Sequence, residues 1–375
     1  MLTRRQFIQT AAATTAAAQM SPKRIALVVS NYRFLSPGQQ LGDRFLVGYP
    51  LDGAWHMPDM KVVSVYIDQH AEGDLSAERS AQFGFQVVPT VADAVRSVDA
   101  VLIAAEPGSD LFEKCVKVFE QAGRAVPVFY YHNLSTTFDK AKTMVESSRR
   151  LRFPLPAGST LPATFRLPDL ELPLGCHIED ALMVGLADFD ALEALQCMVE
   201  RRGHGETGVR AVQLIEGGQV WGRCSRELLT AALSRSDTPL GLTVKDGRTQ
   251  DLVASGELRK LVPKPVAYCV EYRDGLQATA LLLNGAVQDS TFAARVRGTP
   301  EIQSTQFLLP PQPNGTDSAR LIQKVERMFA TRTAPDPVER TLLVSGILES
   351  CLRSKAQNGA RLQTPHLAVA YRAKG

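Results

Sequence analysis

The chain has 375 residues, of which 45% are hydrophobic and 22% are charged, and its formal net charge is +3. This length suits two domains, because single hydrophobic cores seldom grow past roughly 250 residues. The small net charge and the lack of a Lys/Arg cluster interleaved with aromatic residues argue against a nucleic-acid partner. No apolar run approaches the roughly 20 residues that span a bilayer, so the composition predicts a globular protein without a membrane span.

Residues 1–20 stand apart from the rest of the chain. Arg4 and Arg5 precede Phe7 and Ile8, and a weakly apolar Ala/Thr run that ends in small residues follows. The pattern resembles a twin-arginine export signal, which predicts a periplasmic or secreted protein. That pathway moves folded proteins, often with a cofactor already bound. The alternative is a disordered tail with a chance Arg-Arg pair, which leaves the protein in the cytoplasm.

Residues 21–160 alternate between strand and helix signals. Helical spacing predicts helices at 111–122, between the cap candidate Ser109 and Gly123, and at 138–148. Short apolar runs predict four strands, at 25–29, 62–67, 98–105 and 126–131. Buried strands separated by helices indicate a parallel, doubly wound α/β sheet. This segment is therefore predicted to be a Rossmann-type domain.

Residues 161–375 have a different character. The run at 209–215 predicts a strand, and Asp274-Gly275 between two β-rich runs predicts a hairpin. Helical patterns lie near Cys197, at 319–330, and from an N-cap candidate Asp336 onward. We expect an α+β domain built on a large, mainly antiparallel sheet, with the C-terminal helices packing back on the first domain.

Three long stretches carry a family resemblance. They are "DLSAERSAQFGFQVVPTVADAVRSVDAVLIAAEPG", "GRAVPVFYYHNLSTTFDKAKTMVESSRRLRFPLPAGST" and "KVERMFATRTAPDPVERTLLVSGILESCLRSKAQNGARL". Their order and spacing resemble the glucose-fructose oxidoreductase, inositol dehydrogenase and MocA (Gfo/Idh/MocA) family over nearly the whole mature chain. The resemblance implies an NAD(P)-binding Rossmann domain, a carbohydrate or polyol substrate, and a second-domain sheet that often pairs subunits into a homo-oligomer.

The predicted cofactor loop departs from the family. Members carry G-x-G-x-x-G after their first strand, where glycine lets the backbone approach a pyrophosphate. In that place this chain has the candidate cofactor contacts Ser30, Asn31, Tyr32 and Arg33. Asp68 and Glu106, which follow the second and third predicted strands, complete the candidate set for NAD or NADP. Gly38 or Gly42 offers a different turn, although Gly42 can equally be an ordinary loop glycine.

The stretch "FYYHNLS" supplies the first catalytic candidates. His132 and Asn133 stand where the family has Glu-Lys, at the carboxyl end of a predicted parallel strand, where such sheets bind ligands. His132 can act as a general acid or base, and Asn133 can hydrogen-bond a sugar hydroxyl. Tyr131 can stack on a sugar ring. The alternative is a histidine that only caps the strand end.

A second set of candidates opens the helix near Cys197. Asp190 and Glu193 lie one turn apart on one helix side, and either can act as a base if desolvation raises its pKa. The alternative is an acidic first turn that complements the helix dipole. Arg166 in "LPATFRLP" either lines a substrate cleft or lies on the surface. His177 and Glu179 lack a third ligand nearby, so no metal site is predicted.

Two functions remain open from the sequence. The first is an exported oxidoreductase-like enzyme acting on a carbohydrate or polyol with bound NAD(P), whose hydride chemistry the cofactor supplies. The second is a cofactor-free family member that acts as a sugar-binding protein or as an acid/base lyase. The fold alone does not decide between them.

Overall fold

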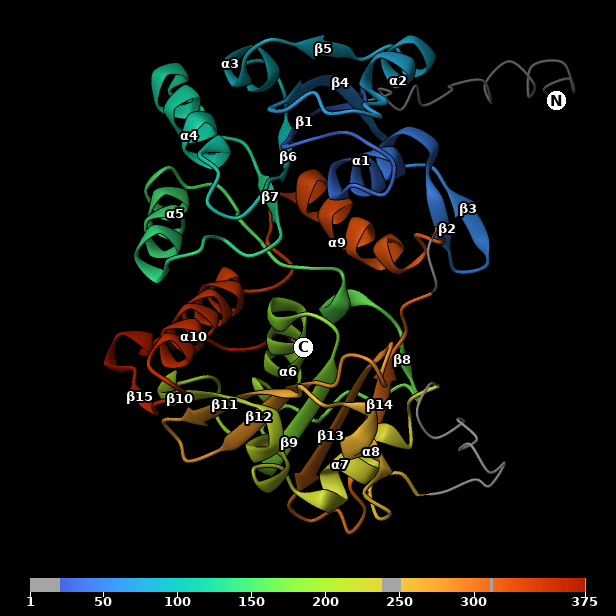
Figure 1. Ribbon diagram of the computed structural model, residues 1–375. Helices are drawn as coiled ribbons and strands as arrows, with labels where there is room; N and C mark the ends of the chain where they lie inside the picture. The colour runs from blue at the N-terminus through green and yellow to red at the C-terminus, as the bar shows by residue number, and fades with distance from the viewer. Residues whose placement is uncertain (1–20, 238–250, 311–312, 375) are drawn as a thin grey trace, which may run out of the picture.

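A computed structural model describes residues 21–237, 251–310 and 313–374. The segment that resembles an export signal, residues 1–20, lies outside the described residues. Figure 1 shows two units, with a smaller sheet among helices above and a broader sheet below. No helix in the described part of the chain is long and apolar enough to cross a membrane.

The first unit contains a five-stranded, fully parallel sheet in the order β5-β4-β1-β6-β7. Its strands are β1 (Lys23–Val29), β4 (Met60–Ile67), β5 (Gln86–Val88), β6 (Ala100–Ala104) and β7 (Val128–Tyr131). The four strands predicted from apolar runs are confirmed. β5 spans only three residues, which is too short for a periodic signal.

Helices cover both faces of this sheet, as predicted for a doubly wound fold. Ala26 and Val28 of β1 pack with one helix layer, and Ile25, Leu27 and Val29 pack with the other. The first layer holds α3 (Val91–Val95), α4 (Leu111–Ala122) and α5 (Phe138–Arg150), and the second holds α1 (Pro37–Val47). The short helix α2 (Ser76–Phe83) lies beside β5.

Two local predictions in the first unit need correction, and one element was not predicted. The N-cap of α4 is Asp110 rather than Ser109, although the Ser109 hydroxyl accepts a hydrogen bond from Leu111 N. Gly38 and Gly42 are neither turn nor loop glycines, because α1 contains both of them. The chain after α1 forms an additional hairpin, β2 (Tyr49–Leu51) with β3 (Ala54–His56).

The second unit is built on an eight-stranded sheet in the order β15-β10-β11-β12-β9-β13-β14-β8. Only β9 and β12 pair in parallel, so the sheet is mainly antiparallel, as predicted. The predicted hairpin joins β11 and β12, with Gly275 at a φ of 99°. The strands are β8 (Arg166–Leu167), β9 (Ile178–Gly185), β10 (Val209–Glu216), β11 (Val266–Tyr272), β12 (Gln277–Leu282), β13 (Ser290–Val296), β14 (Gln303–Phe307) and β15 (Leu362–Gln363).

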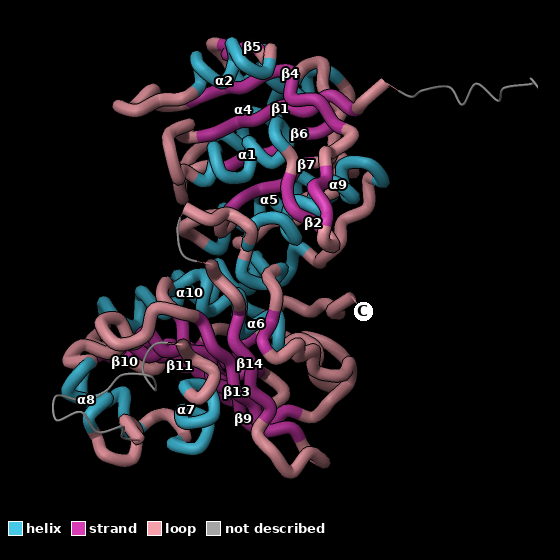
Figure 2. Tube along the Cα trace, turned by 90° about the vertical axis from the view of Figure 1, so that its right-hand side faces the viewer, coloured by secondary structure: helices cyan, strands magenta, loops and turns pink. Residues whose placement is uncertain are grey.

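Helices also cover both faces of the broad sheet (Figures 1 and 2). The face toward the first unit carries α6 (Asp188–Val199) and α10 (Val338–Ala356), and the other face carries α7 (Arg226–Leu233) and α8 (Glu257–Leu261). Short 3₁₀ segments complete the unit at Leu161–Ala163, Gly217–Gly222 and Pro365–Leu367. Because α7 and α8 pack on five strands of that outer face, pairing of two subunits through it would require both helices to move.

The C-terminal helices connect the two units. Helix α9 (Asp317–Thr331) places Ile322, Val325 and Phe329 in the same core as β1 and α1. Helix α10 packs against α5 and α6. It begins at Val338, with Pro337 as its N-cap, one residue later than predicted, because the carboxylate of the predicted N-cap Asp336 instead pairs with Lys324 and Arg340.

We predict that Gly38→Ala destabilises the fold by about 1–3 kcal/mol, because overpacking costs energy of this size. A Cβ at Gly38 would lie 2.7 Å from the carbonyl oxygen of Asn31 and 2.9 Å from a methyl carbon of Val29. Chemical denaturation measures the effect. The control is Gly218→Ala, where a Cβ meets no atom within 4 Å. Equal stability of the two variants would contradict the close packing of α1 on β1.

Candidate functional site

The carboxyl ends of the parallel strands place four predicted residues along one edge of the sheet. Ser30 follows β1, Asp68 follows β4, Glu106 follows β6 and His132 follows β7. Glu106 N donates to the Ser30 hydroxyl at 2.8 Å, which joins two of the strand ends. The side chains of Asp68 and Glu106 are exposed. This edge is where open α/β sheets bind ligands.

The loop after β1 does not put all its side chains on that edge. Tyr32 is 1% exposed and packs in the core, where its hydroxyl donates to Asp43 of α1. Burial, with the neighbouring Asp43 carboxylate, raises the pKa of the Tyr32 hydroxyl. The predicted cofactor contact by this side chain is therefore corrected: it fills the interface between α1 and β1. Arg33 is exposed and Asn31 is half-buried, so these two remain at the edge.

His132 and Asp190 meet at the carboxyl end of β7. His132 Nε2 lies 2.7 Å from Asp190 Oδ1, and the two side chains are 25% and 36% exposed. The ring of Phe189 lies 4.3 Å from that of His132, and the ring of Tyr131 lies 5.3 Å from it, measured between centroids. The imidazole is thus held by an aromatic pair and a carboxylate while part of it stays open to a ligand.

The surroundings of His132 favour its charged form. Burial of the imidazole lowers its pKa, but the hydrogen bond to Asp190 and the negative charge of Asp190, with a smaller effect from Asp188, outweigh burial and raise the pKa of His132. A histidine paired in this way can give up or take back a proton at Nδ1, the ring nitrogen that does not face the carboxylate, with Asp190 stabilising the imidazolium.

Asn133 and Glu193 do not reach the exposed part of the pair. Asn133 is 6% exposed and its amide donates to the carbonyl of Ser135 at 3.1 Å. Glu193 is 1% exposed, and its carboxylate accepts hydrogen bonds from Ser159 N, the Ser159 hydroxyl and the Thr341 hydroxyl at 2.7, 2.8 and 3.1 Å. Burial raises the pKa of Glu193 to about 7 despite these donors. Of the two acidic candidates, Asp190 alone lies beside His132.

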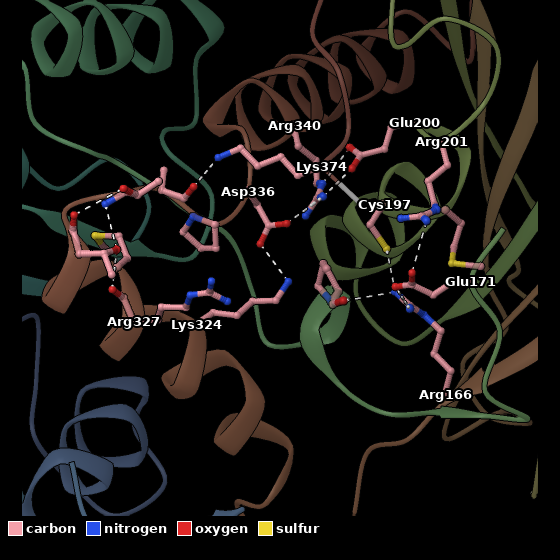
Figure 3. Close-up of a pocket in the computed structure, with 17 residues that line it drawn as sticks. Arg166, Glu171, Cys197, Glu200, Arg201, Lys324, Arg327, Asp336, Arg340 and Lys374 are labelled. Atoms are coloured by element: carbon pink, nitrogen blue, oxygen red, sulfur yellow. Dashed lines mark hydrogen bonds and ion pairs between the residues drawn. The ribbon is translucent and has the colours of Figure 1, made fainter. Parts of the chain in front are cut away.

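Arg166 lies at a different place. Its guanidinium donates to Glu171 and to the carbonyl of Pro162, and it lines a cavity at the opposite end of α6 from Asp190 (Figure 3). Seven residues of α-helix separate Asp190 from Cys197, which also lines that cavity, and they span about 10 Å. The structure therefore does not bring Arg166 together with the His132 pair.

Sequence patterns did not single out several residues that the structure places at these sites. Phe189 packs on His132, and Ser159 and Thr341 hold Glu193. Phe189 sits in the acidic helix start that drew attention to Asp190, but nothing in the sequence marks Ser159 or Thr341, which are 34 and 148 residues away from Glu193. Within the described ranges, no group of three or more His, Cys, Asp or Glu residues is arranged to hold a metal ion.

No protein-family model and no curated protein matches the chain by sequence. In fold, 219 chains of solved structures match it, including three that contain NAD or NAD(H). GenD2 from gentamicin A biosynthesis in complex with NAD has 14% identity and a TM-score of 0.57, covering 92% of this chain and 97% of that one. The myo-inositol dehydrogenase from Lactobacillus casei in complex with NAD(H) and myo-inositol has 10% identity and a TM-score of 0.54, covering 91% and 96%.

The third is an inositol dehydrogenase homolog complexed with NAD+ from Azotobacter vinelandii, with 14% identity, a TM-score of 0.53, and coverage of 92% and 98%. The chain has the two-domain fold of such Gfo/Idh/MocA proteins, which confirms the resemblance at the level of fold.

We predict that stability of the native chain falls as pH rises from about 4.5 to about 7, because folded Glu193 keeps a proton that the unfolded chain has already lost. This contribution is fully present below the unfolded pKa and amounts to on the order of 3 kcal/mol. Glu193→Gln lacks it, so its stability should depend less on pH than that of the native chain. Denaturant unfolding at several pH values measures the difference.

The control is Glu72→Gln, which changes an exposed carboxyl group. That variant should follow the native pH dependence. An unchanged pH dependence in Glu193→Gln would show that the Glu193 carboxyl is ionised in the fold.

Proposed function

We propose that this chain is a divergent member of the Gfo/Idh/MocA family, an oxidoreductase-like protein that binds a polyol or carbohydrate beside His132 and uses NAD. The observation that carries the proposal is the His132–Asp190 pair, which joins the end of the last parallel strand to the start of α6. NAD-bound solved structures with the same fold support the cofactor. The twin-arginine pattern supports it too, since that route carries folded, loaded proteins.

The residues at the sheet edge fit a dinucleotide in two respects. Asp68 is an exposed carboxylate at the end of the second parallel strand in the chain, where an acidic residue accepts the ribose hydroxyls of NAD. The same charge disfavours the 2′-phosphate of NADP. Helix α1 begins just after the loop that follows β1, which places the positive end of its dipole beside this edge, while Ser36 as N-cap already accepts a hydrogen bond from Gln39 N. NAD is therefore the proposed form.

The His132–Asp190 pair can accept the proton of a substrate hydroxyl. Bound NAD supplies the hydride acceptor. Neutral His132, which donates its Nε2 proton to Asp190, takes the hydroxyl proton at Nδ1 as the carbonyl forms, and Asp190 stabilises the imidazolium that results. Because the pKa of His132 is raised, oxidation is favoured at higher pH and the reverse reduction at lower pH. The half-buried Tyr131 ring provides a flat surface for the ligand ring, and the buried Phe189 ring supports His132 from behind.

The cofactor-free alternative also has an observation in its favour. The segment from Ser30 to Ser36 contains no glycine, and Phe34 at its tip is 64% exposed. Side chains of this segment therefore occupy the space that a glycine-rich loop leaves free for a pyrophosphate. In that case the His132–Asp190 pair serves a sugar-binding or acid/base role alone.

Calorimetric titration with NAD tests the proposal. We expect NAD to bind more tightly than NADP, and Asp68→Ala to weaken NAD about tenfold, since one lost charge-assisted hydrogen bond costs about 1.5 kcal/mol. The matched control is Asp59→Ala, an exposed carboxylate away from the carboxyl ends of the parallel strands. If NAD does not bind but polyols do, and His132→Gln abolishes polyol binding, the cofactor-free alternative replaces the proposal.

A further inference from the structure

Figure 3 shows a cavity of the molecule, whose volume is about 540 Å³ and whose lining does not include His132. Its walls come from the last turn of α6, the last turns of α9, the segment that links α9 to α10, and the segment around Arg166. Arg332, just past α9, donates to the carbonyl of Ala125, which precedes β7. The cavity therefore lies toward the amino ends of the parallel strands, opposite the edge assigned to the dinucleotide.

The lining is strongly basic. Three carboxylates contribute to it, from Glu171, Glu200 and Asp336. Six cationic side chains surround them, from Arg166, Arg201, Lys324, Arg327, Arg340 and Lys374. Three positive charges are thus in excess within one concave site, whereas the whole 375-residue chain carries a net charge of only +3. Such focusing of one charge sign attracts counter-ions.

The carboxylates are already engaged by their neighbours. Glu200 is 2% exposed and accepts hydrogen bonds from Arg340 at 2.8 Å and from the Tyr371 hydroxyl at 2.8 Å. Asp336 accepts from Lys324 at 3.0 Å. These bonds neutralise Glu200 and Asp336 by pairing them with Arg340 and Lys324. The remaining positive charge of the lining can therefore be balanced by an anionic ligand.

Two cations of the lining, Arg327 and Lys374, have no carboxylate partner among the described residues. Arg327 is exposed on α9, and the ammonium group of Lys374 bonds only to the carbonyl of Ala334. The side chain of Arg166 is 12% exposed, and its Nη1 lies 3.5 Å from a carboxylate oxygen of the exposed Glu171. The buried Nε of Arg166 has no hydrogen-bond partner. A buried donor without a partner costs free energy that an anionic ligand would offset.

The remaining lining suits a small organic ligand. Met198 and Met328 provide apolar surface, and Thr331 and Thr333 provide hydroxyl groups. The volume falls in the range of small-molecule sites, roughly 300–1,000 Å³.

We propose that this cavity binds a small organic molecule carrying about two negative charges on oxygen, as a phosphate monoester or a dicarboxylate has. This site goes beyond the proposed function and does not depend on it. A ligand held there contacts α6, α9 and α10 together and so bridges the two units. Guanidinium groups bind such oxyanions through paired, charge-assisted hydrogen bonds.

Calorimetry in phosphate-free buffer of low ionic strength tests the proposal with phenyl phosphate, succinate and neutral benzyl alcohol as probes. We expect at least one anionic probe to bind and benzyl alcohol not to bind. Binding of phenyl phosphate alone identifies a phosphate ligand, and binding of succinate alone identifies a dicarboxylate. The double variant R327Q/K374Q should weaken the bound probe at least about tenfold, because each removes a charge-assisted contact.

The matched control is K117Q/R353Q, which removes the same two charges from exposed positions outside the cavity. It should leave affinity unchanged. Absence of binding by both anionic probes would overturn the proposal. Equal weakening in the two double variants would overturn it as well, because the effect would then follow net charge rather than this cavity.

Discussion

A line of buried polar side chains on α6 is the constraint on which the two sites depend. Glu193, Gln196 and Glu200 recur at helical spacing along a segment that is buried almost throughout, and buried polar groups must be hydrogen-bonded. Their partners come from distant parts of the chain, namely Ser159, Thr341, Glu206, Tyr272, Tyr371 and Arg340. Forming all of these hydrogen bonds together fixes the rotation of α6 about its axis. That rotation in turn fixes which side chains each end of the helix places at a site. One end presents Asp190 to His132, and the other closes the basic cavity.

The fold was largely predictable because its signals are local. Apolar runs marked the long parallel strands, and Gly275 marked the β11–β12 hairpin. Elements without a local signal were missed, such as the three-residue strand β5 and the hairpin of β2 and β3. The prediction that Gly38 or Gly42 forms a turn or loop was wrong for a related reason. Gly38 and Gly42 lie in α1 because β1 approaches that helix closely, and this is a tertiary requirement that the sequence around them does not display.

The candidate site was predictable in part. Position in the fold pointed to His132 and Asp190, since strand ends and helix starts meet at one edge of the sheet. The direction of each side chain was not predictable, because it depends on contacts far away in sequence. Tyr32 turns inward to Asp43, Glu193 turns inward to Ser159 and Thr341, and Arg166 lines the other cavity. The basic cavity gathers residues from positions 162 to 374, so no stretch of sequence displays it.

A crystal structure of the chain grown with NAD tests the central claim most directly, namely that the edge beside His132 is the dinucleotide site. We predict a nucleotide along the carboxyl ends of β1, β4 and β6, with its ribose at Asp68 and its nicotinamide ring against His132. Electron density for the nucleotide in the basic cavity instead, or an unchanged edge at saturating NAD, would contradict it.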